Sequence, residues 1–265
     1  MSDKTGIAWT DHTFNPWWGC TKVSPGCDFC YAERDSKRYG FDVWGSSAER
    51  RFFGDKHWNQ PLIWNRQAAE TGRRARVFCA SMADVFEDRR DLDAQRERLW
   101  DLIIRTPELD WQLLTKRPEN MRGLAPWGNG VWPDNVWAMT TAEDQERYDK
   151  RVRHLLRVDA RVRGISYEPA LGPLRLRTEE YVLIHWVIVG GESHQDRTKA
   201  RPFDIAWADA VLKECKNSGV PVFMKQLGSR PRQGGEYAIR VEGISGKGDD
   251  PTEWPAWLNV REFPR

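Results

Sequence analysis

The sequence has no long hydrophobic run, since its longest apolar stretch is the segment 182–189 (VLIHWVIV). A membrane-spanning helix needs about 20 predominantly apolar residues, which this segment does not supply. The first residues, MSDKTG, are polar and lack the apolar core of a secretory signal. We therefore expect a cytoplasmic protein that has no membrane partner and keeps its cysteines reduced.

Familiar motifs of phosphate binding and hydrolysis are also missing. The chain has no glycine-rich phosphate loop and no G-x-S-x-G sequence. Its five histidines share no spacing typical of metal ligands, so we expect no second metal beyond the cysteine site described next. The formal net charge is only +2, which argues against a large non-specific surface for nucleic acid but not against a local one.

Cysteine is scarce and unevenly placed. Three of the five cysteines, Cys20, Cys27 and Cys30, fall in the segment 14–31 (FNPWWGCTKVSPGCDFCY) with the spacing C-x6-C-x2-C. In a reducing compartment such a cluster indicates metal or redox chemistry rather than disulfides. Three alternatives remain open: a structural zinc site with a fourth ligand from elsewhere, three unligated thiols, or an iron–sulfur cluster with one iron open to a non-protein ligand.

Tryptophan is abundant in the sequence, and arginine occurs in clusters. The 15 tryptophans in 265 residues either fill the core or stack on bases in a cleft. Arginines cluster at 50–51, 73–76 and 151–157. Each cluster is either a solvated helix face or part of a track for nucleic-acid phosphates, and composition does not separate the two.

Short apolar runs alternate with helical patterns, which predicts parallel strands joined by right-handed crossovers. The expected strands are a first one near 10–15, then 76–81, 111–115, 136–140, 162–167, 185–189 and 220–225. The fold class is therefore α/β, a partial or complete TIM-like (βα) barrel of about six to seven parallel strands. We expect a single domain over residues 1–265, with a Trp/Arg-rich insertion at 41–75 and a C-terminal covering tail at 228–265.

Helices are expected between these strands. One begins at Asp91 as N-cap and continues to about residue 105, with an apolar stripe of Leu92, Leu99, Ile103 and Ile104. A second covers 143–157. A third begins at the cap Asp204 and ends at Gly219.

The end of the cysteine segment, CDFCY, resembles the radical S-adenosylmethionine (SAM) superfamily, in which C-x-φ-C with an aromatic φ follows a further cysteine near the end of the first barrel strand. The commonest spacing there is C-x3-C-x2-C, whereas this chain has six residues between Cys20 and Cys27. A longer loop closes at little extra entropic cost. The longer spacing therefore concerns the geometry of the loop between Cys20 and Cys27 more than the presence of the cluster.

Six blocks of sequence resemble a narrower family. They are FNPWWGC, LLTKRP, NVWAMTTAEDQ, ISYEPALGPL, WVIVGGES and VPVFMKQLG, and they occur in this order. Together they are similar to a family of phage and bacterial proteins of unknown function, distantly similar to the spore photoproduct lyase branch of the superfamily. This resemblance covers nearly the whole chain, from residue 7 to residue 264.

The resemblance implies a [4Fe–4S] cluster on Cys20, Cys27 and Cys30, with SAM as ligand of the open iron and an external one-electron reductant. One electron cleaves SAM, and the 5′-deoxyadenosyl radical then abstracts hydrogen from a substrate. Three thiols suffice on this reading, because SAM supplies the missing ligands.

SAM-binding residues are implied at the strand ends. The candidates are Phe29 and Tyr31 near the adenine, Ser81, Met82 and Asp84 near the amino group, Lys116 near the carboxylate, and Thr140 and Thr141 near the ribose hydroxyls. The alternative for each polar residue is that it caps a helix.

Four residues are candidates for catalysis: Glu168, Glu192, Lys225 and Cys79. The first three follow barrel strands at their carboxyl ends, as Gln226 does, and this is the active-site face of any barrel. Glu192 belongs to a GGE sequence after the sixth strand, where it either faces substrate or stabilises a loop. Cys79 is expected in the core, but it is a better candidate for a hydrogen donor than the helical Cys215.

The resemblance implies a nucleic acid or modified nucleotide as substrate. A phage setting indicates DNA modification, for example an isomerase step on an amino-acid adduct in thymidine hypermodification, in the host cytoplasm. Two alternatives stay open. One is a radical SAM enzyme acting on a small molecule or peptide, and the other is a non-catalytic cysteine–metal binding module with a protein partner.

Overall fold

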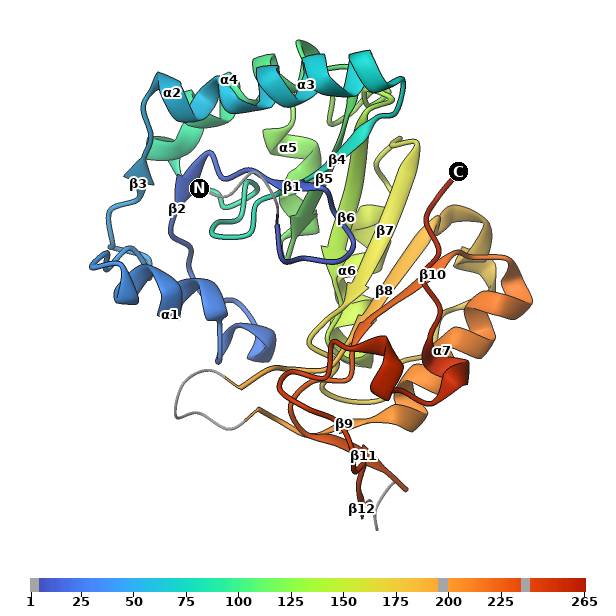
Figure 1. Cartoon of the computed structure of the whole chain (residues 1–265). Helices are drawn as coiled ribbons and strands as arrows, with labels where there is room; N and C mark the ends of the chain where they lie inside the picture. The colour runs from blue at the N-terminus through green and yellow to red at the C-terminus, as the bar shows by residue number, and fades with distance from the viewer. Residues whose placement is uncertain (1–4, 195–199, 235–238) are drawn as a thin grey trace. The chain divides into compact units, whose positions relative to one another are not determined.

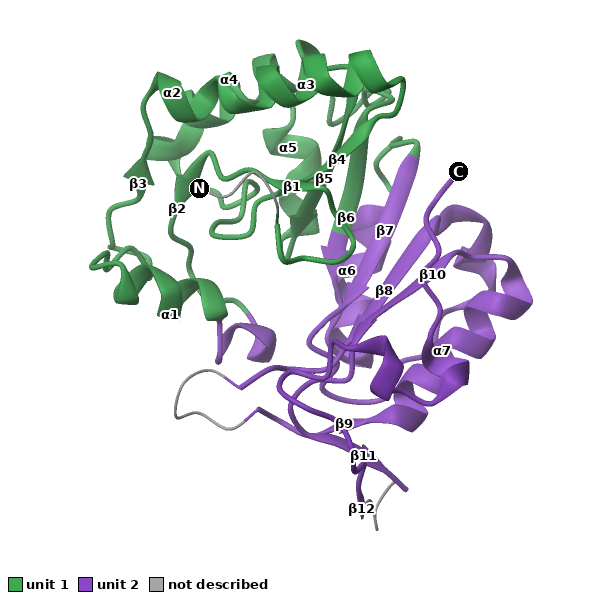
Figure 2. Ribbon diagram, viewed as in Figure 1, with its two compact units in different colours: residues 1–23, 31–139, 157–161 green, residues 24–30, 140–156, 162–265 purple. Residues whose placement is uncertain are grey.

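The computed structural model describes residues 5–194, 200–234 and 239–265 (Figure 1). The chain divides into two compact units (Figure 2). Unit 1 contains residues 1–23, 31–139 and 157–161, and unit 2 contains residues 24–30, 140–156 and 162–265. Cys20 therefore belongs to unit 1, while Cys27 and Cys30 belong to unit 2.

Seven strands form the main sheet in the order β1-β4-β5-β6-β7-β8-β10. They are β1 (His12–Thr13), β4 (Ala75–Cys79), β5 (Leu109–Thr115), β6 (Val136–Thr141), β7 (Val162–Tyr167), β8 (Trp186–Gly190) and β10 (Val222–Gln226). The pairs β1–β4, β4–β5, β7–β8 and β8–β10 are parallel. The order follows the chain without reversal, as in a barrel and unlike a doubly wound sheet, so the predicted α/β fold with a partial (βα) barrel is confirmed.

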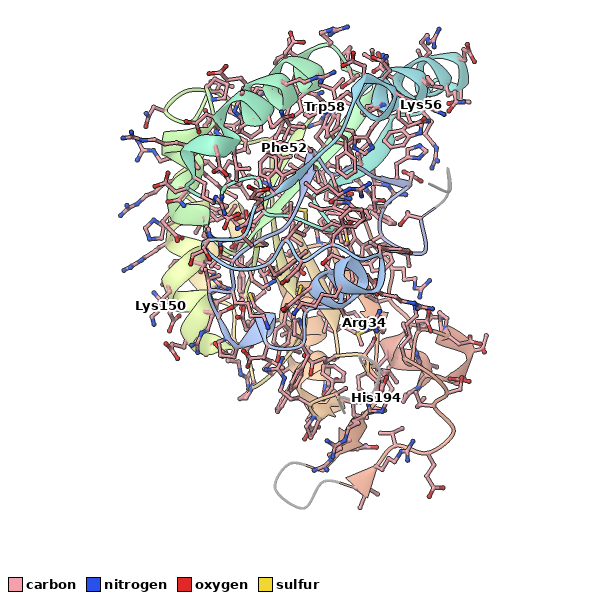
Figure 3. All side chains as sticks on the ribbon, turned by 90° about the vertical axis from the view of Figure 1, so that its left-hand side faces the viewer. Arg34, Phe52, Lys56, Trp58, Lys150 and His194 are labelled. Atoms are coloured by element: carbon pink, nitrogen blue, oxygen red, sulfur yellow. The ribbon has the colours of Figure 1, made fainter. Side chains whose placement is uncertain are left out.

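Unit 1 builds its core from aromatic rings. Trp9, Trp17, Trp111 and Trp132 are each at most 2% exposed, so much of the tryptophan content is core. Its remaining elements are β2 (Trp17–Trp18), α1 (Tyr31–Arg38), β3 (Arg51–Phe52), α2 (Asp55–Trp58), α3 (Gln60–Thr71), η2 (Arg90–Leu92), α4 (Asp93–Ile104), η3 (Pro118–Asn120) and α5 (Met121–Leu124). Within the insertion, Trp58 is buried while Phe52 is 45% exposed (Figure 3).

The start of α4 corrects the sequence analysis. Asp91 is not its N-cap, because Asp91 lies in the 3-10 turn η2 and its carboxylate accepts from Arg89 at 2.5 and 2.9 Å. The helix begins at Asp93, one residue later than a cap at Asp91 requires, and Leu92 is its N-cap. Ile104 is also misplaced in the predicted stripe, since it is 58% exposed at the last helical position. Leu99 and Ile103 are buried as expected.

Unit 2 carries β7, β8 and β10 with two longer helices. The elements not yet named are η1 (Pro25–Cys27), α6 (Gln145–Leu155), η4 (Thr178–Leu183), β9 (Phe203–Asp204), α7 (Ile205–Ser218), β11 (Pro231–Gln233), β12 (Ile239–Arg240), η6 (Pro251–Glu253) and η7 (Ala256–Leu258). Both predicted ends of α7 are confirmed: the Asp204 carboxylate accepts from Ala206 N, and Gly219 closes the helix with φ 73°. Lys150 projects from α6 into solvent (Figure 3).

The C-terminal tail packs against β8 and β10 of its own unit through hydrogen bonds. Met224 N of β10 donates to Val260 O at 2.8 Å, and Trp186 Nε1 of β8 donates to Glu262 O at 2.9 Å. Trp254 and Leu258 are buried. Among the residues that the structure describes, no helix is long and apolar enough to cross a membrane.

Candidate active site

The loop after β4 is held by an asparagine that the sequence analysis did not single out. Asn15 Oδ1 accepts from Met82 N at 2.7 Å, and Asn15 Nδ2 donates to Ser81 Oγ at 3.1 Å. The Tyr31 hydroxyl donates to Ser81 O at 3.1 Å. Three candidate SAM residues of unit 1, Ser81, Met82 and Tyr31, therefore meet in one place. The position of Asn15 two residues after the first strand was the available signal.

Asp84 lies at the centre of a buried polar network. Its carboxylate accepts from the Thr115 hydroxyl at 2.6 Å, Arg117 Nη1 at 2.9 Å, and the backbone amides of Phe86 at 3.0 Å and Lys116 at 3.1 Å. The three donors from residues 115–117 tie the loop after β4 to the end of β5. Asp84 thus has a strong structural role, and its contact with SAM stays a prediction.

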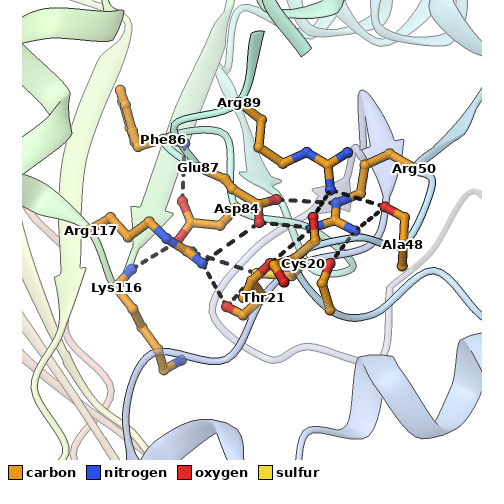
Figure 4. A network of polar contacts seen from close by, with 12 residues as sticks. Cys20, Thr21, Ala48, Arg50, Asp84, Phe86, Glu87, Arg89, Lys116 and Arg117 are labelled. Atoms are coloured by element: carbon orange, nitrogen blue, oxygen red, sulfur yellow. Dashed lines mark hydrogen bonds and ion pairs between the residues drawn. The ribbon is translucent and has the colours of Figure 1, made fainter. Parts of the chain in front are cut away.

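Arg117 connects this network to Cys20 (Figure 4). Its Nη1 lies 3.6 Å from Cys20 Sγ, and its Nη2 donates to Thr21 O at 2.6 Å. Burial raises the pKa of the Cys20 thiol to about 12, and the Asp84 carboxylate adds to this, while the Arg117 guanidinium acts in the opposite direction. Arg117 follows Lys116 in the LLTKRP block, so only its place at a strand end could have marked it.

Arg50 fixes the same region from the other side (Figure 4). Its side chain is fully buried and forms a bidentate ion pair with Glu87, at 2.8 and 3.2 Å. Its Nη1 donates to the carbonyls of Val43, Gly45 and Ala48 at 2.9–3.0 Å. Neither interpretation of the arginine cluster, a solvated helix face or a phosphate track, applies to Arg50, because its charge is neutralised in the interior.

The glycine before Cys20 permits this packing. Gly19 has φ 115°, a conformation that side chains rarely adopt. A Cβ at Gly19 would lie 2.3 Å from Val43 O and 2.6 Å from Arg50 Cδ. The residue before Cys20 must therefore be glycine in this arrangement.

In unit 2, the segment 24–30 carries Cys27 and Cys30. Its turn η1 closes with Cys27 N donating to Ser24 O at 2.8 Å, and Gly26 N donates to Glu143 Oε1 at 3.3 Å. Glu143 is fully buried and pairs with Arg151 at 2.7 Å. Arg151 is therefore a second arginine to which neither interpretation of its cluster applies.

Arg201 also reaches the cysteine segment. Its guanidinium lies over the Phe29 ring at 4.8 Å and donates to Pro25 O at 2.8 Å. The same guanidinium forms an ion pair with Glu192 at 2.5 Å. Phe29, a candidate for contact with adenine, therefore stacks against a cation of its own unit, and its role with SAM stays a prediction.

The ends of β7, β8 and β10 bring together other candidate side chains of unit 2. Glu168, directly after β7, forms an ion pair with Lys225 of β10, and both side chains are about one-fifth exposed or less. Gln226 Nε2 donates to Gly191 O at 2.7 Å and to Ser193 Oγ at 2.9 Å. Glu168 and Lys225 are thus neighbours, although they lie 57 residues apart in the chain.

The remaining candidates are placed as follows. Thr140 and Thr141 are the buried last residues of β6. Lys116 follows β5 and is partly exposed. Cys79 ends β4 with 0% exposure, which confirms the core position, and burial raises the pKa of its thiol. Cys215 is equally buried in α7.

The donor set fits an iron–sulfur cluster by its chemistry. Cys20, Cys27 and Cys30 are partly exposed, in contrast to the buried Cys79 and Cys215. Cluster iron prefers thiolate ligands, and a guanidinium beside Cys20 stabilises negative charge on sulfur. No set of three or more His, Cys, Asp and Glu side chains in the described ranges is arranged to hold a metal ion. Ligation by the three cysteines, which are divided between the two units, stays a prediction.

Comparisons with known proteins give one family and several distant structures. A family model described as protein of unknown function (DUF5131) matches residues 4–253. A cysteine-to-serine variant of spore photoproduct lyase is similar with 11% identity and a TM-score of 0.46, over 85% of this chain and 58% of that chain. A double variant of the same enzyme with bound AdoMet and dinucleoside spore photoproduct gives 11% identity and a TM-score of 0.44, over 82% and 56%.

The chain thus spans less than two thirds of the length of these two structures. No curated protein matches the sequence.

Proposed function

Because this chain belongs to the family described as protein of unknown function (DUF5131), we propose a function from its own residues: a radical SAM enzyme with a [4Fe–4S] cluster on Cys20, Cys27 and Cys30. The observation that carries this proposal is the contrast among the five cysteines. The three in the C-x6-C-x2-C segment are partly exposed; Arg117 lies beside Cys20, and Arg201 contacts the segment that carries Cys27 and Cys30. The other two are buried in a strand and a helix.

The cluster and SAM, when bound, would supply one-electron chemistry that generates a radical able to abstract hydrogen. The chain's own residues would position these groups. Arg117 would hold Cys20 and compensate charge on its sulfur, since its guanidinium is anchored by Asp84 at 2.9 Å. Ser81 and Met82, fixed by Asn15, would orient the SAM amino group. Lys116 would meet the SAM carboxylate.

On the side of unit 2, Glu168 and Lys225 would serve the substrate. In their ion pair, Lys225 Nζ lies beside a carboxylate acceptor. Such a pair can donate a hydrogen bond to a base carbonyl, or accept one from a base amide, without further proton transfer. Thr140 and Thr141 at the end of β6 would bind ribose hydroxyls.

The proposed substrate is a modified nucleobase in DNA, with isomerisation of an amino-acid-modified thymidine as the example that the sequence resemblance supports. Action on duplex DNA would require the base to leave the stack, or a single-stranded substrate. An external one-electron reductant completes the reaction. The alternatives are a small-molecule or peptide substrate, and a binding module without catalysis.

Anaerobic reconstitution with iron and sulfide tests the proposal. The reduced protein should give a [4Fe–4S] electron paramagnetic resonance signal that changes when SAM is added, and it should form 5′-deoxyadenosine. Cys215→Ala, which changes a thiol outside the motif, is the matched control and should keep both properties. A colourless protein with stoichiometric zinc, or a cluster indifferent to SAM, would overturn the proposal in favour of a binding module.

A further inference from the structure

The carboxylate of Glu192 is fully engaged by one arginine. Glu192 Oε2 accepts from Arg201 N at 2.9 Å and from Arg201 Nε at 3.0 Å, and Glu192 Oε1 accepts from Arg201 Nη2 at 2.5 Å. Glu192 is 7% exposed. Both carboxylate oxygens are thus directed at Arg201, and little of the side chain is left to meet another molecule.

Arg201 uses its remaining donor group on the cysteine segment. Its Nη1 donates to Pro25 O at 2.8 Å and lies 3.5 Å from Asp28 Oδ2, while its plane covers the Phe29 ring. Pro25 O also accepts from Asp28 N at 3.1 Å and so closes the turn that carries Cys27. The guanidinium therefore links Glu192, after the end of β8, to the turn η1 that carries Cys27.

A second tether reaches the same turn from the end of β6. Gly26 N donates to Glu143, which Arg151 holds in place. A Cβ at Gly26 would lie 3.0 Å from Glu143 Oε1, so the approach of the backbone to this carboxylate is close. Two acidic residues at strand ends thus fix the segment 24–30, one directly and one through an arginine.

We propose that Glu192 acts through Arg201 as a positioning residue for the segment that carries Cys27 and Cys30, and does not itself meet the substrate. The planar guanidinium suits this role, because it binds a carboxylate through one edge and a carbonyl through another while stacking on an aromatic ring. A lysine cannot satisfy all three contacts at once. The link to a cluster rests on the proposed function, whereas the link to the order of the segment does not.

Hydrogen–deuterium exchange on the protein without cluster tests the tether directly. In Arg201→Met, the amides of residues 24–30 should exchange about tenfold faster than in the parent protein, because a charge-assisted anchor is lost. Glu192→Gln should give a smaller acceleration, since the amide oxygen still accepts one bond. Arg201→Lys should restore only part of the protection.

Arg175→Met is the matched control. Arg175 also pairs with a glutamate, Glu214, at 2.7 Å, and that glutamate also accepts from a backbone amide, Leu176 N at 2.9 Å. This pair does not contact the cysteine segment, so exchange over 24–30 should be unchanged. Circular dichroism on each variant separates loosening of one segment from unfolding.

Reconstitution supplies the second measurement. If the parent protein forms a cluster, Arg201→Met should show lower iron content and an altered electron paramagnetic resonance line shape, and Arg175→Met should show neither. Unchanged exchange over 24–30 in both Arg201→Met and Glu192→Gln would overturn the inference, whatever the cluster does. A parent protein without a cluster would overturn the proposed function while the exchange data still decide the tether.

Discussion

Cys20 and the Cys27–Cys30 segment are positioned by charged side chains of different kinds. Beside Cys20, four charged residues form a buried network: Arg50, Asp84, Glu87 and Arg117, with side-chain exposures of 0%, 7%, 5% and 9%. The segment 24–30 depends on Glu143 and on Arg201, whose side chain is 26% exposed.

This difference in exposure leads us to expect different effects on the stability of the whole protein and on the order of one segment. Removing one partner from a buried ion network leaves an uncompensated charge in the interior, which weakens the whole fold. A partly exposed ion pair such as Arg201–Glu192 contributes less to the free energy of unfolding, but we expect it to determine whether one segment is ordered. Cys20, itself partly exposed, therefore adjoins the buried network of unit 1, whereas we expect the segment with the other two thiols to loosen while unit 2 stays folded.

The largest effect is expected from substitution of the cysteines themselves, which should affect Cys20 and the Cys27–Cys30 segment equally. Cys20→Ala, Cys27→Ala and Cys30→Ala should each abolish SAM cleavage, because a cluster with two protein ligands is poorly held. The measurement is 5′-deoxyadenosine formed by the reconstituted proteins, with the parent protein as reference. Normal cleavage by Cys20→Ala would contradict the assignment of the C-x6-C spacing.

Arg50→Met should destabilise the protein by about 3–5 kcal/mol, because the buried Glu87 keeps only the more distant Arg117, at 3.9 Å, and three carbonyls lose their donor. Urea unfolding measures the change. Arg89→Met is the control, since Arg89 pairs with the half-exposed Asp91 and should matter by less than about 1 kcal/mol. Equal effects of the two substitutions would show that the network beside Cys20 is not a buried anchor.

Ionisation of Asp11 should make the stability of the protein depend on pH. Burial would raise the pKa of Asp11, but hydrogen bonds and charge from Arg76 outweigh it and hold the pKa below the ordinary 3.8. The stability that Asp11 contributes is then present above about pH 4 and lost as pH falls through the folded pKa.

Asp11→Asn should accordingly cost about 1–2 kcal/mol at pH 7, with a difference from the parent that shrinks below pH 4. Urea unfolding at several pH values measures it. A constant difference across this range would contradict the linkage between Asp11 ionisation and stability.

The smallest expected effect on stability comes from Gly26→Ala, about 1 kcal/mol, because the new Cβ displaces Glu143 by a few tenths of an ångström. Cluster content should fall more than this modest loss implies, since the amide of Gly26 loses its acceptor. Gly172→Ala is the control, because the nearest atom to its Cβ would be an ordinary 3.8 Å away. Equal cluster content in both variants would contradict the role of Glu143 in positioning the segment 24–30.

Local features were predictable from the sequence. The seven strands, the core position of Cys79 and both ends of α7 follow from apolar periodicity and from caps that use residues a few positions away. Asp91 shows where such reasoning fails: it has the residue type of an N-cap, but Arg89 binds its carboxylate and the helix begins at Asp93.

Long-range partners were not predictable. Nothing in the sequence near Arg50 indicates Glu87, 37 positions away, and nothing near Pro25 indicates Arg201, 176 positions away. Each arginine carries the same charge in the sequence whether it is solvated, buried or used as a tether. Burial and partner choice depend on which strand ends the fold brings together.

The sequence by itself determined the positions of the strands along the chain, the spacing of the three thiols and the polar residues that follow each strand, because these depend on neighbours along the chain. Only the tertiary structure decided that Cys20 lies beside a buried ion network, that Glu168 meets Lys225, and that Glu192 is occupied by Arg201. Those outcomes depend on desolvation and on side chains distant in sequence, which a linear pattern does not encode.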